Sequence, residues 1–280
     1  MSGSYHIAAD SCTDHDVLKD NENVNYVPLI LSVDGKEIFD DESFDQQDFL
    51  EKIAHSKNGG KSACPSPFAF AQAYGDDDED AYGITLSSKV SGSYSSAKVA
   101  ADLVQQERPN KKIHVFDSKS AACGQTLILL KLKECLKNGF SFDKTVTTVE
   151  KYISEMSTVF VLQDLSAFQK SGRISHLEGF LGGMLNIKPV LGSTPEGAIK
   201  KVGIGRGTRQ AMKKLVDYIG ETVIDPASKT LGITYCNCKA RAEELRDEIM
   251  ARYPFKDSIL LAAAGVSTLY AADGGIVVAY

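Results

Sequence analysis

Residues 82–106 read YGITLSSKVSGSYSSAKVAADLVQQ and combine a strand, a serine-rich turn and a helix in one stretch. The apolar run over residues 82–86 predicts the strand. Small apolar side chains within residues 93–106 recur at helical spacing, which predicts a helix that packs closely on a sheet. A strand that runs directly into a helix is typical of the βαβ units of parallel sheets. This stretch therefore predicts an α/β protein.

The turn over residues 86–97 is one of two serine-rich turns, and the other spans residues 61–67 with the sequence KSACPSP. Each precedes a predicted helix, where backbone N–H groups lack partners within the helix and the helix dipole favours negative charge. Small hydroxyl groups and free amides at such a place can bind an anion. Ordinary helix capping would explain either turn alone. The two turns together favour an anion site.

Other predicted strands bring further polar residues to the same edge of the sheet. Strands are expected over residues 6–9, 26–32 and 113–116, and the first and last of them run into Asp10 and Asp117. Ligands of open α/β sheets bind beyond the carboxyl ends of the strands. We therefore expect these acidic residues and the second serine-rich turn to converge in space.

The alternation of strands and helices starts again near residue 157, which predicts two α/β domains, residues 1–157 and residues 158–280. The first is expected to hold a largely parallel sheet flanked by helices. Further helices are predicted over residues 44–55, 67–74, 208–219 and 240–253, together with one capped by Ser141, and further strands over residues 159–162, 231–235 and 259–263.

The overall composition excludes several classes of protein. The net charge of −6 argues against a general nucleic-acid binder, because such a protein offsets phosphate charge with a basic surface. No segment approaches the roughly 20 consecutive apolar residues of a membrane span. The N-terminus has no charged region followed by an apolar one, so a cytoplasmic protein is expected.

Motifs for metals and nucleotides are incomplete. Cys236 and Cys238 are one residue apart, which is not the spacing of a zinc or redox motif, so free thiols and no metal are expected. The acidic run at residues 76–80 lacks the spaced oxygen ligands of a calcium loop and is expected to be a solvated loop. Residues 59–62 lack the first glycine of a phosphate loop, and residues 203–207 lack the dinucleotide spacing. No cofactor is expected.

Motifs distributed along nearly the whole chain resemble those of the DegV family, in the same order. The agreement of many separated motifs makes this resemblance specific. The matching residues are Ile7-Ala8-Ala9-Asp10-Ser11-Cys12-Thr13-Asp14, Val27-Pro28-Leu29-Ile30, Asp34-Gly35-Lys36-Glu37, both serine-rich turns, Phe116-Asp117-Ser118, Lys170-Ser171-Gly172-Arg173-Ile174-Ser175, Asn186-Ile187-Lys188-Pro189 and the basic stretch over residues 206–214.

The resemblance implies a protein that holds a long-chain fatty acid between two α/β domains. Ser62, where the family commonly has Thr, and Ser91, with the Gly92 amide beside it, would bind the carboxylate. Arg173 would lie near the headgroup or at the docking surface for a partner kinase. The apolar tail would lie in a tunnel, for which residues 160–165 and 180–191 are the candidate lining.

Members of this family resemble the lipid-carrying subunit of bacterial fatty acid kinase, which presents the carboxylate to an ATP-using partner for phospholipid synthesis. The resemblance thus implies a carrier and not an enzyme. This chain departs from the family at Tyr270, where many members have His. Tyr donates a hydrogen bond but does not shuttle protons near neutral pH, so lipid binding survives this change better than kinase coupling does.

Two other functions remain as alternatives. A serine esterase acting on lipid would use Ser91 or Ser62 as the nucleophile, although the turn is not Gly-x-Ser-x-Gly and no histidine lies in a segment typical of a triad base. A lipid-sensing regulator would respond to its ligand by domain closure.

Overall fold

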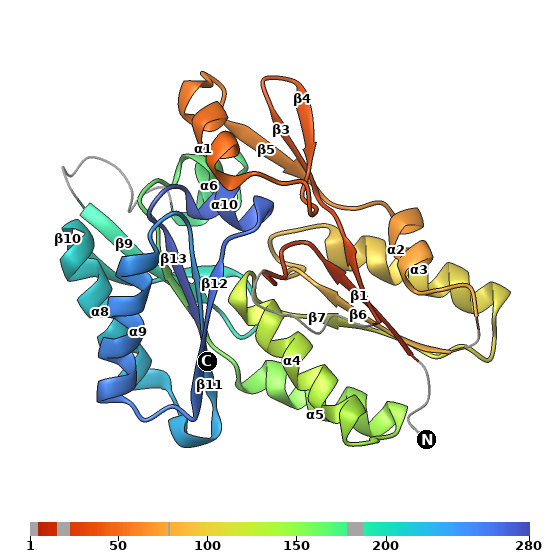
Figure 1. Cartoon of the computed structure of the whole chain (residues 1–280). Helices are drawn as coiled ribbons and strands as arrows, with labels where there is room; N and C mark the ends of the chain where they lie inside the picture. Colours follow the sequence, from red (N-terminus) through yellow and green to blue (C-terminus); the bar gives the residue numbers. More distant parts are fainter. Residues whose placement is uncertain (1–4, 16–22, 78, 178–186) are drawn as a thin grey trace.

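The first sheet has four strands, all parallel, in the order β2–β1–β6–β7 (Figure 1). It belongs to a computed structural model that describes residues 5–15, 23–77, 79–177 and 187–280. This sheet confirms the parallel N-terminal sheet predicted from the sequence. Its strands are β1 (Tyr5–Asp10), β2 (Val24–Val27), β6 (Asp80–Thr85) and β7 (Ile113–Asp117).

Helices cover both faces of this sheet. Alternate side chains of the strands pack against α2 (Pro67–Ala73) and α3 (Ser93–Glu107) on one face. They pack against α4 (Cys123–Lys137) and α5 (Phe142–Glu155) on the other face. The predicted cap of α5 is present, since the Ser141 side chain accepts a hydrogen bond from the Lys144 amide.

A small antiparallel sheet, in the order β4–β3–β5, was not predicted. The single strand expected over residues 26–32 is divided in two, because Pro28 has no N–H to donate and the chain leaves the first sheet there. The first serine-rich turn begins within the third strand of this sheet. Its elements are β3 (Ile30–Val33), β4 (Lys36–Phe39) and β5 (Gly60–Ala63), and α1 (Gln46–His55) lies beside it.

A six-stranded mixed sheet is formed by strands that all follow residue 157. Its order is β10–β9–β8–β13–β11–β12, and β11 and β12 form its parallel pair. Two long helices, α8 (Gly207–Thr222) and α9 (Lys239–Arg252), cover one face (Figure 1). The other elements are β8 (Thr158–Val161), β9 (Ile187–Ser193), β10 (Ile199–Arg206), β11 (Thr230–Tyr235), β12 (Asp257–Ala262), β13 (Ile276–Ala279), α6 (Ser166–Lys170), α10 (Gly265–Ala271) and two short 3-10 helices, Ser175–Leu177 and Pro226–Ser228.

Helix α4 lies between the two large sheets. Its Ile128 and Leu132 belong to the core of the first sheet, whereas Leu127 packs against Leu261 and Ala279 of the six-stranded sheet. Ten of its fifteen residues are buried. A helix covered on so many sides has no single apolar face, which explains why its sequence pattern did not predict it.

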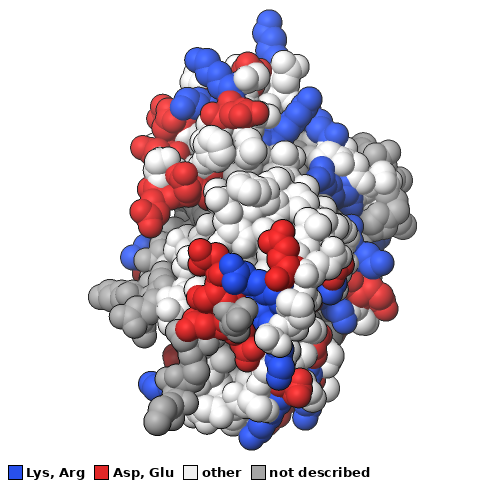
Figure 2. Space-filling view, turned by 90° about the vertical axis from the view of Figure 1, so that its right-hand side faces the viewer, with Lys and Arg blue, Asp and Glu red and all other residues white. Residues whose placement is uncertain are grey.

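The helices and one face of the surface were compared with the composition of the sequence. Among the described residues, no helix has both the length and the apolar composition that crossing a bilayer requires. The face shown in Figure 2 carries both acidic and basic side chains among its described residues, so this face does not present a purely basic surface.

Candidate functional site

The second serine-rich turn is held by acidic residues from the neighbouring strands. Asp10, at the end of β1, accepts a hydrogen bond from the Leu86 amide at 2.8 Å. Asp117, at the end of β7, accepts one from the Ser88 amide at 3.0 Å and another from the Ser88 hydroxyl. The carboxyl ends of three parallel strands therefore meet here, as the sequence predicted.

Ser91 and Gly92 lie at the N-terminal end of α3. The Ser91 Oγ accepts a hydrogen bond from the Ser93 amide at 3.2 Å and lies 3.1 Å from the Ser93 Oγ. The Ser91 side chain is half-buried and Gly92 is exposed. Ser91 thus precedes the N-cap residue Gly92 and accepts from the first amide of α3, while its hydroxyl hydrogen can still be donated to an anion.

The first serine-rich turn meets α10. The Ser62 Oγ, on β5, lies 3.0 Å from the phenolic oxygen of Tyr270, on α10. This close approach needs a glycine two residues earlier, because a Cβ atom at Gly60 would lie 2.6 Å from a methyl carbon of Leu269. Two residues separated by 208 positions are thereby brought into one hydroxyl pair.

The two serine-rich turns also touch each other. Cys64 of the first turn is exposed, and its Sγ lies 4.0 Å from the Ser96 Oγ on α3. A Cβ atom at Gly92 would lie 3.1 Å from the same sulfur. The contact between the turns is therefore made by Cys64, against the first turn of α3.

Arg173 joins the second turn to Tyr270. Its Nε donates to the Val90 carbonyl at 3.1 Å, and one terminal nitrogen donates to the Ser171 carbonyl at 3.2 Å. The guanidinium carbon lies 5.9 Å from the centre of the Tyr270 ring, within range of a cation–π interaction. Ser62, Tyr270 and Arg173 thus form one group, which we call the headgroup cluster.

An apolar cavity borders this cluster and lies between the first sheet and the six-stranded sheet. Its empty space is about 770 Å³, including the part open to solvent. Tyr270 and Arg173 line it, whereas Ser62, Ser91 and Gly92 are not among its lining residues. Of the predicted tunnel lining, residues 180–186 lie outside the described residues. Apolar side chains lining the cavity include Leu86, Val90, Phe160, Phe168, Val266 and Val277.

Buried carboxyl groups bind backbone amides at two places: Asp10 binds the Leu86 amide, and Asp14 and Asp40 bind the amides at the start of α10. Sequence reasoning gave Asp14 and Asp40 no role. Asp10 and Asp14 are fully buried, and Asp40 is 4% exposed. Burial raises the pKa of Asp10 to about 6 and that of Asp14 to about 7, and it also raises the pKa of Asp40. The motif at residues 10–14 follows a strand, and this position could have indicated that its acidic residues belong to a site. Nothing in the sequence indicated that Asp40 lies near them.

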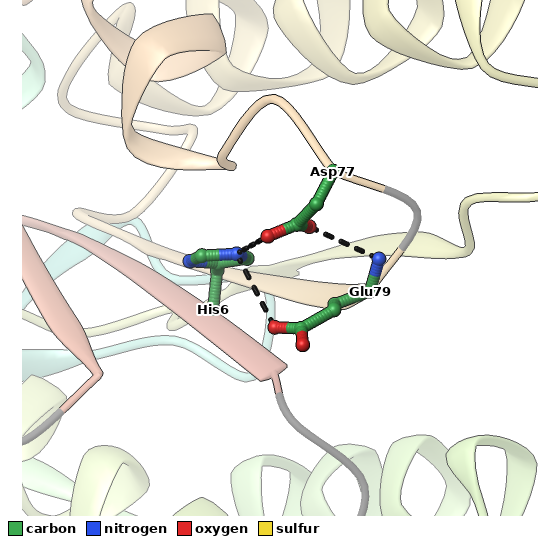
Figure 3. A group of neighbouring side chains, drawn as sticks. All are labelled: His6, Asp77 and Glu79. Atoms are coloured by element: carbon green, nitrogen blue, oxygen red, sulfur yellow. Dashed lines mark hydrogen bonds and ion pairs between the residues drawn. The ribbon is translucent and has the colours of Figure 1, made fainter.

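A different group of ionisable residues lies near the start of β1 (Figure 3). His6 Nε2 lies 2.8 Å from Asp77 and 3.6 Å from Glu79, and the buried Lys111 ammonium lies 3.2 Å from Asp77. The hydrogen bond with His6 holds the pKa of Asp77 well below its usual value. The acidic loop is therefore paired with two basic side chains rather than only solvated. We call these four residues the His6 cluster.

The histidines give no support to a catalytic triad. His6 and His114 pair with carboxylates, and His15 and His55 hydrogen-bond to backbone carbonyls. None of these four bonds joins Ser62 or Ser91. Among the histidine side chains that the structure describes, there is no base bonded to either serine of the esterase alternative.

The model of uncharacterised DegV family proteins matches residues 4–280 of this chain. The chain belongs to the DegV family. A DegV domain-containing protein of Streptococcus gordonii is 31% identical over 99% of both chains. A DegV family protein of Ruminococcus gnavus, solved with vaccenic acid, is 39% identical with a TM-score of 0.95 over 100% of both chains. The fatty acid kinase (Fak) B3 protein of Streptococcus pneumoniae, solved with linoleic acid, is 28% identical with a TM-score of 0.91 over 99% of both chains.

Proposed function

We propose that this protein binds a long-chain fatty acid, with the carboxylate at the headgroup cluster and the tail in the cavity between the two sheets. The observation that carries the proposal is an apolar cavity bordered by Tyr270 and Arg173. The fatty acids in the solved relatives from Ruminococcus gnavus and Streptococcus pneumoniae support it. A fatty acid is the class of ligand that matches polar donors beside an apolar space.

The carboxylate would be bound mainly by hydroxyl groups. One member of the Ser62–Tyr270 pair donates to the other, which leaves one hydroxyl hydrogen for the ligand. Ser91 and the Gly92 amide add donors at the end of α3, where the helix dipole favours an anion. Arg173 adds positive charge from the other side of the Tyr270 ring. Charge-assisted hydrogen bonds of this kind need no metal ion.

The tail would supply most of the affinity. Burial contributes roughly 0.8 kcal/mol per CH₂, so a chain of about sixteen carbons contributes on the order of 10 kcal/mol before ordering costs. The hydroxyl groups would then set the direction of the ligand, and the shape of the cavity would select its length.

The direct test is to denature purified protein and identify released lipid by mass spectrometry. Near-stoichiometric fatty acid is expected, and lipid-free protein should gain thermal stability with palmitate or oleate. Well-folded protein that is empty and gains nothing would contradict the proposal. Ser62→Ala with Ser91→Ala should weaken binding at least about tenfold, through the loss of two charge-assisted bonds. Ser95→Ala, on an exposed position of α3, is the matched control.

The proposal extends to a carrier role, in which the bound carboxylate is presented to an ATP-using kinase. The name of the Streptococcus pneumoniae relative supports this role, as do the incomplete nucleotide motifs of this chain. Conversion of bound palmitate to acyl phosphate should require both this protein and the kinase subunit with ATP. Acyl phosphate formed by this protein alone would overturn the carrier role, and so would the lack of any product with the kinase present.

A further inference from the structure

The first turn of α10 rests on two carboxyl groups from the other end of the chain. The Ala264 amide donates to Asp14 Oδ1 at 2.8 Å. The Gly265 amide donates to Asp40 Oδ1, and the Val266 amide donates to Asp40 Oδ2 at 2.9 Å. Three consecutive backbone amides are thus bound by two buried acids. We call this arrangement the α10 joint.

Each acid in the joint is braced by a hydroxyl group. Ser11 Oγ donates to Asp40 at 2.8 Å, and Thr234 Oγ1, on β11, donates to Asp14 at 2.7 Å. A Cβ atom at Gly265 would lie 2.5 Å from Asp40 Oδ1, so a glycine is needed for the amide to reach the carboxyl group. The joint is close-packed and leaves little room for another arrangement.

The joint fixes one wall of the cavity. Val266, Ser267 and Tyr270 of α10 all line the cavity, and Tyr270 continues to the Ser62 hydroxyl. A shift at the start of so short a helix moves the side chains of its only two turns. The position of Tyr270 therefore depends on Asp14 and Asp40, although neither lines the cavity.

The joint holds negative charge without a strong counter-ion. Among the described residues, no Lys or Arg forms an ion pair with Asp10, Asp14 or Asp40. The amides of residues 264–266 and the Ser11 and Thr234 hydroxyl groups donate to these carboxyl oxygens and favour the ionised form, whereas burial opposes it. The other titratable groups that act on Asp14 or Asp40 are Cys12, His15, Cys123 and Cys236, of which only His15 can carry positive charge.

We propose that Asp14 and Asp40 are positioning residues of the ligand site, which hold the start of α10 and, through this helix, Tyr270. The part that concerns the ligand rests on the proposed function. The seating itself is a property of the empty protein. It depends on the amide and hydroxyl donors that the two carboxyl groups accept, so a change of either carboxyl group should loosen α10.

Hydrogen exchange of lipid-free protein tests the seating directly. Protection of residues 264–271 should fall at least about threefold in Asp40→Asn relative to wild type, since the NH₂ group of the asparagine would face an amide donor. Protection of α9, on the far side of the six-stranded sheet, should stay constant. Wild-type protection of α10 in this variant would overturn the proposal.

Two further variants grade the effect. Asp14→Asn should loosen α10 less than Asp40→Asn does, because its Oδ1 can still accept from Ala264 and the Thr234 hydroxyl can turn to accept. Asp143→Asn, on an exposed position of α5, should behave as wild type. A larger loss of protection in Asp14→Asn than in Asp40→Asn would contradict the assignment.

Binding of cis-parinaric acid, a fluorescent fatty acid, connects the joint to the site. Asp40→Asn should weaken binding at least about tenfold, with Ser62 and Ser91 intact. Wild-type affinity in Asp40→Asn would overturn the positioning role. If Asp40→Asn loosens α10 but wild-type protein binds no fatty acid, the proposed function fails while the seating stands.

Discussion

The α10 joint and the His6 cluster both gather carboxyl groups, but they compensate the charge differently. In the joint, Asp14 and Asp40 are buried among backbone amides and hydroxyl groups, and burial raises the pKa of both. In the His6 cluster, Asp77 is half exposed and lies between His6 and the buried Lys111, and its pKa is lowered. The same side chain thus favours a proton in one place and ionisation in the other. The surrounding donors and the access of water decide which.

The largest difference between the two regions should appear when one carboxyl group is removed from each. Asp40→Ala leaves the Gly265 and Val266 amides buried without an acceptor, and should lower the free energy of unfolding by about 4 kcal/mol. Glu79→Ala removes a partly exposed ion pair and should cost less than about 1 kcal/mol. Urea denaturation measures both. Equal losses of unfolding free energy in the two variants would contradict the distinction between the buried α10 joint and the partly exposed His6 cluster.

The pH dependence of stability should have opposite signs in the two regions. The raised pKa of Asp14 makes stability fall as pH rises from about 4 to about 7, by on the order of 3 kcal/mol. The lowered pKa of Asp77 makes stability fall as pH drops below about 3.8, an effect that salt screens. Asp14→Asn should remove only the fall in stability between about pH 4 and about pH 7. Asp77→Asn should remove only the fall below about pH 3.8. Urea midpoints measured across this pH range provide the test.

A pair of glycine variants compares the packing of the two regions. A Cβ atom at Gly265 would meet Asp40 at 2.5 Å, and one at Gly75 would meet the His6 ring at the same distance. The carboxyl group is fixed, whereas a half-buried ring can swing outward. Gly265→Ala should therefore cost about 2 kcal/mol more than Gly75→Ala, even though Gly75 has a φ of +79°. Thermal denaturation of the two variants decides, and a larger loss at Gly75 would contradict this account.

The smallest effect is expected for Lys111→Met. The apolar side chain fills the same buried space, and Asp77 keeps its contact with His6 and its access to water. The partner left behind is half exposed and stays hydrated, so only a weak ion pair is lost and a change within about 1 kcal/mol is expected in urea denaturation. A loss as large as that of Asp40→Ala would show that the His6 cluster is a second rigid joint.

Local patterns predicted the first sheet and its helices because each βα unit carries its own signal. The strand, turn and helix over residues 82–106 are contiguous, and Ser141 caps α5 as expected. The short strand β5 and the central helix α4 were missed. One has only four residues including a glycine, and the other is buried on most sides, with charged residues only in its C-terminal half.

The site was harder to predict because its contacts span the chain. The sequence placed Ser62 and Ser91 on turns and identified Tyr270 and Arg173 by family resemblance. It could not reveal that Tyr270 pairs with Ser62 or that Arg173 binds the Val90 carbonyl. The sequence did not predict that Asp40 binds the first amides of α10, because a carboxyl group that accepts from a distant helix leaves no pattern in the residues around it.

Helix α4 carries a consequence for chimeras built from DegV relatives. One flank of this helix completes the core of the first sheet and the other flank packs on Leu261 and Ala279. In a chimera joined at residue 157, α4 would come from one parent. Leu261 and Ala279, on which it packs, would be replaced by residues of the other parent. Such hybrids should recover solubility only when the residues facing Cys123 and Leu127 are transplanted together with the helix.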